Sequence, residues 1–366
     1  MAPPEPTSRI RLLRPAMSAT GAVLREYLDH LFKAFDRAAE REASPLDLRC
    51  RIAGRTLRIR AAGSALAASI PPALAHLPGS EATPDLDVVA WDETETGVPL
   101  PPRPWIAPEN PTAGRLAVRG GTDGFRIAGV TRAEGIHLFD PDSGRGAWIL
   151  PDARQLPNHQ HAAPLLTILK WWAPEVGLRL LHAGCVGNPA GAVLLAGRGG
   201  SGKSTTSLLC ALEGLDYLSD DYCLTSLGEA PTAFSLYSTG KLHRDHLSRF
   251  PELLSRSADP RPDPGEKPII FLHRHFPESV VLSRPIVAVL APTVTGKPES
   301  SLEPVSPADG LRALAPSTLL QLTPDDASGF SELGRLVRRV PSFRLNLGTR
   351  TEEIAPAIRD LLLRLP

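Results

Sequence analysis

The sequence predicts an α/β domain in the C-terminal part of the chain and an α+β domain before it. The first observation is a short apolar run over residues 191–196, which is followed by a glycine-rich turn and by leucines at helical spacing over residues 204–212. The second is a new strand over residues 216–218, directly after a helix end at Gly214. Strand, helix and strand in this order indicate a βαβ unit. A chain of 366 residues is long enough for two domains, each with its own core.

The first half of the chain provides the third observation, a series of short alternating segments that favours an α+β fold. We expect residues 1–20 to be a disordered tail, residues 21–156 to form the α+β domain, and residues 157–366 to form the α/β domain. The expected elements of the α+β domain are a helix over 21–42, a hairpin over 46–61 that turns at Ala53-Gly54, a helix over 64–76 broken by two prolines, and strands over 85–91, 115–119, 124–127, 136–139 and 146–150.

The α/β domain continues on both sides of the βαβ unit. A helix over 164–172 is expected to pack its apolar face on this domain. Beyond residue 222 the pattern predicts strands over 233–237, 268–273, 280–282, 285–294 and 342–347, and helices over 306–314, 326–340 and 351–365.

The glycine-rich turn carries the most specific motif in the chain. Residues 197–204 satisfy the phosphate-loop pattern G-x-x-x-x-G-K-[ST], and they lie between a predicted strand and a predicted helix, as the pattern requires. In such a loop the backbone N–H groups and the positive end of the helix face a bound anion. The alternative interpretation of the motif is an ordinary glycine-rich turn without a ligand. Lys203 would reach the outer phosphates and the Ser204 hydroxyl would bind Mg²⁺. The residues expected to bind nucleotide are Gly197, Gly199, Gly200, Ser201, Gly202, Lys203, Ser204 and Thr205.

Two adjacent carboxylates follow the loop after a single helix and a single strand. Asp220 and Asp221 end the strand that begins at Asp216. In a right-handed βαβ unit, two adjacent parallel strands end on the same edge of the sheet, so these carboxylates should lie beside the phosphate loop. Most phosphate-loop ATPases carry their metal-binding Asp much further along the chain, so this short spacing argues against motors and transporters. A solvated acidic turn is the alternative.

Three segments together resemble a known family. These are LHAGCV over residues 181–186, GAVLLAGRGGSGKSTT over 191–206 and YLSDDY over 217–222. They are similar to the HPr kinase/phosphorylase-like (HPr serine kinase-like) family, which is distantly related to ATP-dependent phosphoenolpyruvate carboxykinase. The resemblance runs from about His182 to the C-terminus, with its specific matches near the beginning, and the first 150 residues do not share it.

The resemblance implies transfer of the γ-phosphoryl group of ATP to a hydroxyl group. It implies that Asp220 accepts the proton of that hydroxyl with His182 behind it, and that Ser204 and Asp221 hold Mg²⁺, although the two carboxylates could exchange these roles. Lys241 is similar to a family lysine that could steady the transferring phosphate. The alternatives are a buried structural histidine for His182 and the start of a surface helix for Lys241.

The resemblance is incomplete in a way that bears on the substrate. The segment by which HPr kinases dock HPr and catalyse the phosphorylase reaction is absent from this sequence. We therefore expect the acceptor to be a hydroxyl-bearing peptide, protein or small molecule, bound partly by the N-terminal domain. A non-catalytic nucleotide-binding regulatory protein is the second hypothesis. A carboxykinase-like enzyme acting on an oxo acid is the third, and it would need further metal and substrate ligands.

Composition excludes several other classes. Lys and Arg together number 40, as do Asp and Glu, so no net charge favours binding to nucleic acid or to an anionic membrane. The N-terminus lacks the pattern of a secretory signal, no apolar run reaches membrane-spanning length, and the four cysteines have no metal-binding spacing. We expect the protein to be cytoplasmic, and we leave open whether it forms a homo-oligomer. Only six lysines are present, and retention of Lys203 and Lys241 among so many arginines is a mild sign that an ammonium is needed there.

Overall fold

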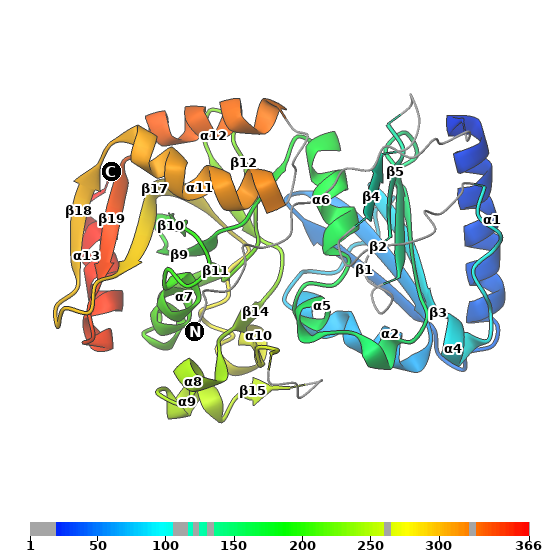
Figure 1. Ribbon diagram of the computed structural model, residues 1–366, viewed down its shortest axis with the longest axis horizontal. Helices are drawn as coiled ribbons and strands as arrows, with labels where there is room; N and C mark the ends of the chain where they lie inside the picture. The colour runs from blue at the N-terminus through cyan, green and yellow to red at the C-terminus, as the bar shows by residue number, and fades with distance from the viewer. Residues whose placement is uncertain are drawn as a thin grey trace, which may run out of the picture.

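The computed structural model describes residues 20–104, 116–119, 124–129, 135–259, 265–321 and 327–365. The tail expected over residues 1–20 lies outside these ranges except for Thr20. Within the described residues the strands form three sheets, of seven, nine and three strands. Figure 1 shows the seven-stranded sheet on one side of the molecule and the nine-stranded sheet on the other, with α6 (Leu166–Glu175) between them. The fold is therefore mixed α/β, and the predicted division at residue 156 stays a prediction.

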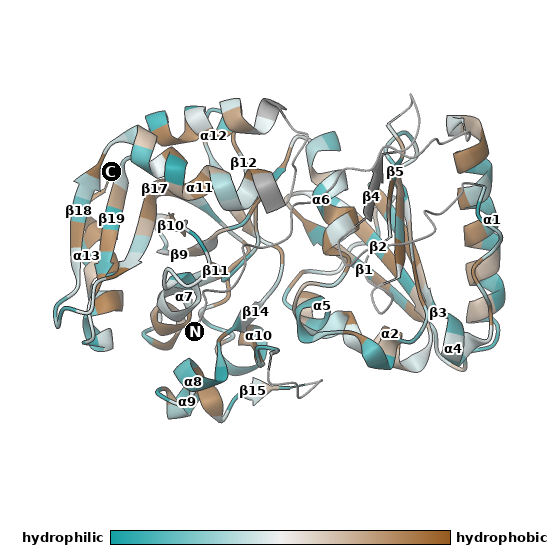
Figure 2. Cartoon of the chain, in the orientation of Figure 1, coloured by the Kyte–Doolittle hydropathy of each residue, from teal (hydrophilic) through white to brown (hydrophobic). Residues whose placement is uncertain are grey.

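The seven-stranded sheet is buried on both faces. Side chains of the inner strand β3 point alternately to the two faces: Val88 and Ala90 belong to one hydrophobic cluster, and Val89 and Trp91 belong to the other. Helix α1 (Gly21–Ala39) covers the second face, and Figure 2 shows hydrophobic residues concentrated on the central strands. The order is β1-β2-β3-β7-β6-β5-β4, in which only β2–β3 and β3–β7 are parallel pairs. The strands are β1 (Leu46–Ile52), β2 (Arg55–Ala62), β3 (Leu86–Asp92), β4 (Leu116–Arg119), β5 (Arg126–Gly129), β6 (Ile136–Asp140) and β7 (Arg145–Leu150).

The expected hairpin is present as β1 and β2, which pair antiparallel. Its turn needs two residues with positive φ, and Ala53 and Gly54 have φ of 51° and 79°. The helix broken by prolines is also present as α2 (Ser64–Ser69) and α3 (Pro71–Leu74). Shorter helices of this half are α4 (Glu93–Thr96) and η1 (Ala153–Gln155).

The nine-stranded sheet is covered by helices on both faces. Helices α7 (Lys203–Leu212) and α13 (Ile354–Arg364) share one cluster with Val193 and Leu195 of β10, whereas α11 (Pro307–Gln321) and α12 (Ala327–Arg339) share the other with Leu194. The main path runs β11-β9-β10-β17-β13-β12-β8, and β19 pairs with both β17 and β18. The strands are β8 (Arg179–Leu181), β9 (Gly184–Asn188), β10 (Gly191–Leu195), β11 (Asp216–Ser219), β12 (Cys223–Ser226), β13 (Thr232–Ser235), β17 (Ser283–Val294), β18 (Ser301–Val305) and β19 (Ser342–Leu347).

The βαβ unit differs from its prediction in one respect. Strands β10 and β11 are not adjacent, because β9 lies between them and pairs antiparallel with both. Two strands that are each antiparallel to a third run parallel to one another, so β10 and β11 still end on the same edge of the sheet. The expectation of neighbouring strands was wrong, whereas its consequence for Asp220 and Asp221 holds.

A small three-stranded sheet packs on α7. It consists of β14 (Thr239–Lys241), β16 (Ile269–Phe271) and β15 (Ser257–Ala258), in the order β14-β16-β15. A Cβ atom on Gly240 of β14 would lie 2.5 Å from Leu208 Cδ2 of α7, so the strand and the helix are in direct contact. Short helices α8 (Arg244–Leu247), α9 (Pro251–Leu254) and α10 (Leu272–His275) accompany this sheet.

The linking helices α5 (Asn158–Ala162) and α6 belong to both halves. Ile168 and Trp172 of α6 lie in one cluster with Leu57 and Ile59 of the first sheet, and Tyr237 of the second half joins the same cluster. The expectation that α6 packs on the second domain was therefore incomplete. The connection is polar as well, because the Tyr237 hydroxyl donates to Pro164 O at 2.7 Å.

Three expectations need correction in the second half. Residues 280–282 form no strand, only an isolated bridge from Val280 to Tyr217. Strand β18 was not expected because its sequence SLEPV carries a proline and a glutamate, which an edge strand tolerates. The helix expected over 351–365 begins as a short 3₁₀ turn, η2 (Thr351–Glu353), before α13. Among the described residues, no helix is long and apolar enough to cross a membrane. All four cysteines are buried and free, as expected for core residues.

We predict that Leu208→Ala destabilises the protein by about 2–5 kcal/mol, because this fully buried side chain fills the contact between α7 and β14. Leu363→Ala on α13, where the side chain is 74% exposed, is the matched control and should change stability by less than about 0.5 kcal/mol. Urea unfolding measures both. Equal effects of the two substitutions would contradict the packing described here.

Candidate functional site

Four segments meet at the carboxyl edge of the nine-stranded sheet. They are the glycine-rich loop (residues 197–202) after β10, the acidic pair Asp220-Asp221 after β11, Lys241 at the end of β14, and His182 in the link between β8 and β9. The parallel course of β10 and β11 brings the first two together. The backbone N–H of Lys241 donates to Asp220 Oδ2 at 2.9 Å, and this hydrogen bond attaches β14 to the same edge.

The backbone of the glycine-rich loop is shaped for a turn into α7. Gly202 is the N-cap residue with a φ of +103°, and a Cβ atom there would lie 2.2 Å from Leu347 Cδ1. The first helical hydrogen bond runs from Thr206 N to Gly202 O, so the first-turn amides of α7 have no acceptor within the helix. A Cβ atom on Gly199 or Gly200 would meet nothing within 4 Å. The loop therefore presents amides at an open surface, as an anion site requires.

The Lys203 ammonium lies across this loop. Its Nζ donates to Gly197 O at 2.6 Å and to Arg198 O at 3.3 Å. Burial lowers the pKa of Lys203, and Asp221 and Asp220 only partly oppose this effect. A phosphate oxygen would offer the ammonium a charged partner in place of these two carbonyls.

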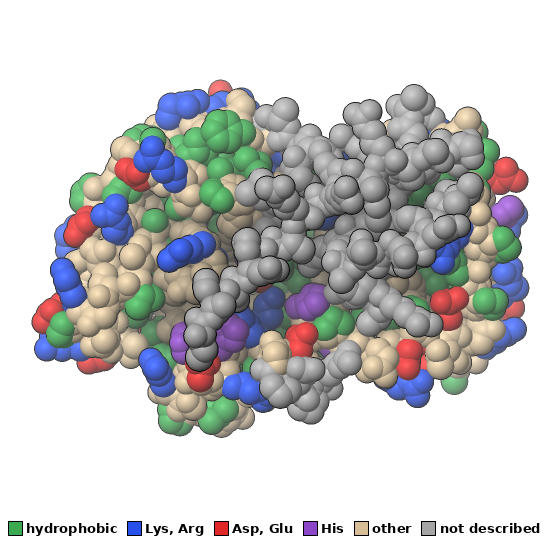
Figure 3. Space-filling view, in the orientation of Figure 1, with side chains coloured by type: hydrophobic (Ala, Val, Ile, Leu, Met, Phe, Trp, Pro, Cys, Tyr) green, Lys and Arg blue, Asp and Glu red, His purple; other side chains and the backbone are tan. Residues whose placement is uncertain are grey.

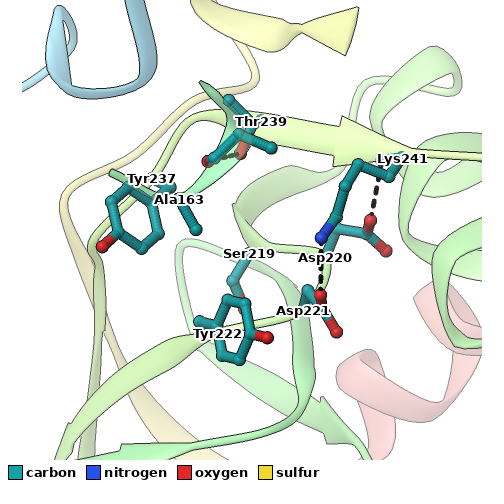
Figure 4. A pocket seen from close by; sticks show the side chains of 9 residues that line it. Ala163, Ser219, Asp220, Asp221, Tyr222, Tyr237, Thr239 and Lys241 are labelled. Carbon is teal, nitrogen blue, oxygen red and sulfur yellow. Dashed lines mark hydrogen bonds and ion pairs between the residues drawn. The ribbon is translucent and has the colours of Figure 1, made fainter. Parts of the chain in front are cut away.

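Asp221 is held by two basic side chains. His182 Nε2 lies 2.6 Å from its Oδ1, and Lys241 Nζ donates to its Oδ2 at 2.9 Å; Figure 4 shows the second contact. Burial raises the pKa of Asp221, but Lys241 and His182 outweigh burial and hold the pKa well below its usual range. In the same way, burial lowers the pKa of Lys241, but Asp221 and other neighbours raise it further than burial lowers it. Asp221 and Lys241 therefore form a charged pair.

Asp220 has a different environment, although it is the next residue in the chain. It is 2% exposed, and its Oδ1 makes no hydrogen bond of normal geometry within the described part of the chain. Burial and then Asp221 raise the pKa of Asp220, while the Ser204 hydroxyl and the Lys241 amide oppose them. A buried carboxylate oxygen without a donor, close to a hydroxyl, fits a divalent cation.

A small, open hollow lies beside these groups (Figure 4). The Tyr222 ring stacks on His182 with centroids 5.5 Å apart, and the Lys241 ammonium lies 5.7 Å from the Tyr222 centroid. The far wall comes from the end of α5, which is fixed because the Thr239 hydroxyl donates to Ala162 O at 2.7 Å. The lining residues are Ala162, Ala163, Ser219, Asp220, Asp221, Tyr222, Tyr237, Thr239 and Lys241.

The structure brings the predicted site residues to one edge but pairs some of them differently. His182 was expected behind Asp220 and instead contacts Asp221. Ser204 was expected beside Asp221, whereas its hydroxyl acts on the carboxyl of Asp220. Sequence reasoning missed Tyr222, which its position next to the acidic pair could have indicated. It also missed Ala162 and Ala163, for which the sequence carries no signal.

The described residues contain no group of three or more His, Cys, Asp or Glu side chains arranged to hold a metal ion. Mg²⁺ is usually bound through one or two carboxylates together with phosphate oxygens and water, so a site that needs the nucleotide is compatible with this finding.

Comparison with known proteins adds little to this picture. No family model matches the chain, and no curated protein does. Among solved structures, the Hpr(Ser) kinase/phosphatase from Coxiella burnetii aligns with 14% sequence identity over 51% of this chain and 97% of that chain, with a TM-score of 0.29. This similarity is too weak to support a function. Any proposed function has to be argued from the residues of the site.

We predict opposite effects for neutralising the two carboxylates. Asp221→Asn leaves the Lys241 ammonium without its counterion and should destabilise the protein by about 3 kcal/mol at pH 7.5. Asp220→Asn removes a buried carboxylate whose pKa is raised, so it should leave stability unchanged or increase it at that pH. Urea unfolding of both variants measures these changes.

The pH dependence follows from the directions of the pKa shifts. The native pKa of Asp220 lies above the ordinary aspartate value of 3.8, so the gain in stability from Asp220→Asn is full above the native pKa and disappears below about pH 4. The native pKa of Asp221 lies below 3.8, so its contribution is present above that value and is lost as the pH falls through the native pKa. A destabilising Asp220→Asn at pH 7.5 would contradict the assignment.

Proposed function

We propose that this protein is an ATP-dependent phosphotransferase that moves the γ-phosphoryl group of ATP to a hydroxyl group. The observation that carries the proposal is the pair of neighbouring carboxylates with different partners at the edge where the glycine-rich loop begins α7. Phosphoryl transfer needs charge neutralisation and positioning more than covalent chemistry, and these residues provide both.

The nucleotide phosphates would bind the amides of the glycine-rich loop and the first turn of α7. The Lys203 ammonium would leave the carbonyls of Gly197 and Arg198 and bind the outer phosphates. Because the ammonium already lies across the loop, this change needs only a rotation of its side chain.

The metal would be Mg²⁺, held by Ser204 and Asp220. This reverses the roles that the resemblance implied, because Asp220 has the unpartnered oxygen and the nearby Ser204 hydroxyl, while both oxygens of Asp221 already contact a side-chain nitrogen. When bound, Mg²⁺ neutralises charge on the outer phosphates. Asp220 has to lose its proton to serve as a ligand, and metal binding favours that loss.

Asp221 would accept the proton of the acceptor hydroxyl. Its side chain is 24% exposed and faces the hollow, whereas Asp220 is almost completely buried. His182 and Lys241 fix the orientation of the carboxylate from the other side. A carboxylate of low pKa suffices in a loose transition state, as the catalytic-loop Asp of protein kinases illustrates.

The acceptor would enter through the hollow between Tyr222 and the end of α5. The hollow lies beside the Asp221 carboxylate, so an acceptor hydroxyl that enters it would come close to the proposed proton acceptor. The expectation that the N-terminal half contributes to acceptor binding stays a prediction.

We predict that wild-type protein transfers ³²P from γ-labelled ATP to an acceptor in an extract of the source organism. Asp221→Asn should reduce the initial rate at least 100-fold, because it removes the proton acceptor. Lys203→Met should reduce transfer through weaker binding of the nucleotide phosphates. Lys297→Met changes an exposed lysine outside the site and is the control.

A labelled acceptor that disappears in Asp221→Asn would establish the activity and identify the substrate. If ATP binds to wild type but no acceptor is labelled beyond the level seen with Asp221→Asn, the kinase proposal fails. The protein would then be a nucleotide-binding regulator.

A further inference from the structure

A further lysine, Lys267, has no partner within the described part of the chain. It is half-buried, and neither a hydrogen bond nor an ion pair of its ammonium occurs among the described residues. It precedes β16, whose Ile269 pairs with Lys241 of β14. Lys267 lies two residues before Ile269, just outside the paired segment. The pairing of β14 and β16 therefore brings Lys267 near the end of the strand that carries Lys241.

Lys267 is also close to the glycine-rich loop. Strand β14 packs on α7, whose first residue is Lys203. Burial is the main cause of the lowered pKa of both Lys203 and His243, and the charge of Lys267 lowers both further. Figure 3 shows histidine and basic side chains gathered over α8, α10 and β14 on this face. Lys203 and Lys267 therefore both bear on this edge, where Asp221 and Asp220 offset part of their positive charge and a bound anion would add to that offset.

Two described acidic residues lie near Lys267 in the chain. Asp259 accepts hydrogen bonds from Asn158 and Arg244. Glu266 precedes Lys267, and its charge bears on His161 of α5. Neither forms an ion pair with the Lys267 ammonium among the described residues, so this ammonium can pair with a ligand.

The backbone of Lys267 is held by a buried amide. Asn158 is completely buried at the start of α5, and its Nδ2 donates to Lys267 O at 3.2 Å and to Asp259 Oδ1 at 2.8 Å. Burying an amide side chain is unfavourable unless its polar groups find partners, so this contact constrains the segment. Asn158 is in this sense a positioning residue for Lys267.

We propose that Lys267 binds the terminal phosphate of the nucleotide, opposite Lys203, and that Asn158 holds it in place for this contact. The inference rests on the proposed function, because it needs a nucleotide triphosphate in the glycine-rich loop. A cation that reaches only the third phosphate distinguishes ATP from ADP by charge. Its role is to select the triphosphate and to neutralise the phosphoryl group that is transferred.

The test is binding of Mg-ATP and of Mg-ADP by isothermal titration calorimetry. Wild type should bind ATP more tightly than ADP, and Lys267→Met should reduce the ratio of the two affinities by roughly tenfold or more, mainly through weaker ATP binding. Lys267→Arg should retain most of the preference, because it keeps the charge. Lys297→Met should behave as wild type.

The outcomes separate this inference from the proposed function. If wild type prefers ATP and Lys267→Met prefers it equally, Lys267 is not a phosphate ligand, while the kinase proposal stands. If wild type binds both nucleotides equally, the inference is also wrong. If wild type binds neither nucleotide, both proposals fail.

Asn158→Ala tests the positioning role. It should lower the ATP-to-ADP affinity ratio in wild type but have no further effect on that ratio in Lys267→Met, because the two residues act through one contact. Circular dichroism and thermal unfolding confirm that the variant is folded. An equal loss of ATP and ADP affinity would show a purely structural role and would overturn the positioning claim.

Discussion

The site depends on the charged contact between Asp221 and Lys241, to which His182 adds a second donor. Moving a carboxylate and an ammonium out of water costs several kcal/mol for each ion, and only a close, hydrogen-bonded pair offsets that cost. The contact joins the end of β11 to the end of β14, two strands that belong to different sheets. It therefore fixes the small sheet against the larger one, and with it the position of every group that faces the glycine-rich loop.

The same contact gives two sequence neighbours different chemistry. Asp221 contacts both Lys241 and His182, and its pKa is low, whereas Asp220 receives one backbone amide, and its pKa rises through burial and the charge of Asp221. Asp221 is thus accessible and ionised in the resting site, and Asp220 is buried and would lose its proton more readily when a cation binds. Phosphoryl transfer needs both kinds of group beside a phosphate-binding loop. Lys267 fits the same scheme, because its ammonium makes no ion pair among the described residues and its charge acts on Lys203, where the phosphates of a nucleotide would bind.

The sequence predicted those features that depend on residues close together in the chain, and it did not predict those that depend on contacts between distant segments. The glycine-rich loop, helix α7, the hairpin turn at Ala53-Gly54 and the position of the acidic pair depend on nearby residues, and local pattern predicted them. The insertion of β9 between β10 and β11 depends on pairing between distant segments, and no local pattern encodes it. The partners of Asp220 and Asp221 stayed open in the sequence for the same reason. Both carboxylates lie at one strand end, and the paths of β14 and of the β8–β9 link decide which of them meets Lys241 and His182.

The most direct test of this account is electron paramagnetic resonance of Mn²⁺, used in place of Mg²⁺, with and without ATP. We predict tight Mn²⁺ binding only when ATP is present, with coupling to ³¹P, and loss of that signal in Asp220→Asn but not in the exposed control Lys297→Met. Tight Mn²⁺ binding without nucleotide, or an unchanged ATP-dependent signal in Asp220→Asn, would contradict the assignment of Asp220 and with it the proposed arrangement of the site.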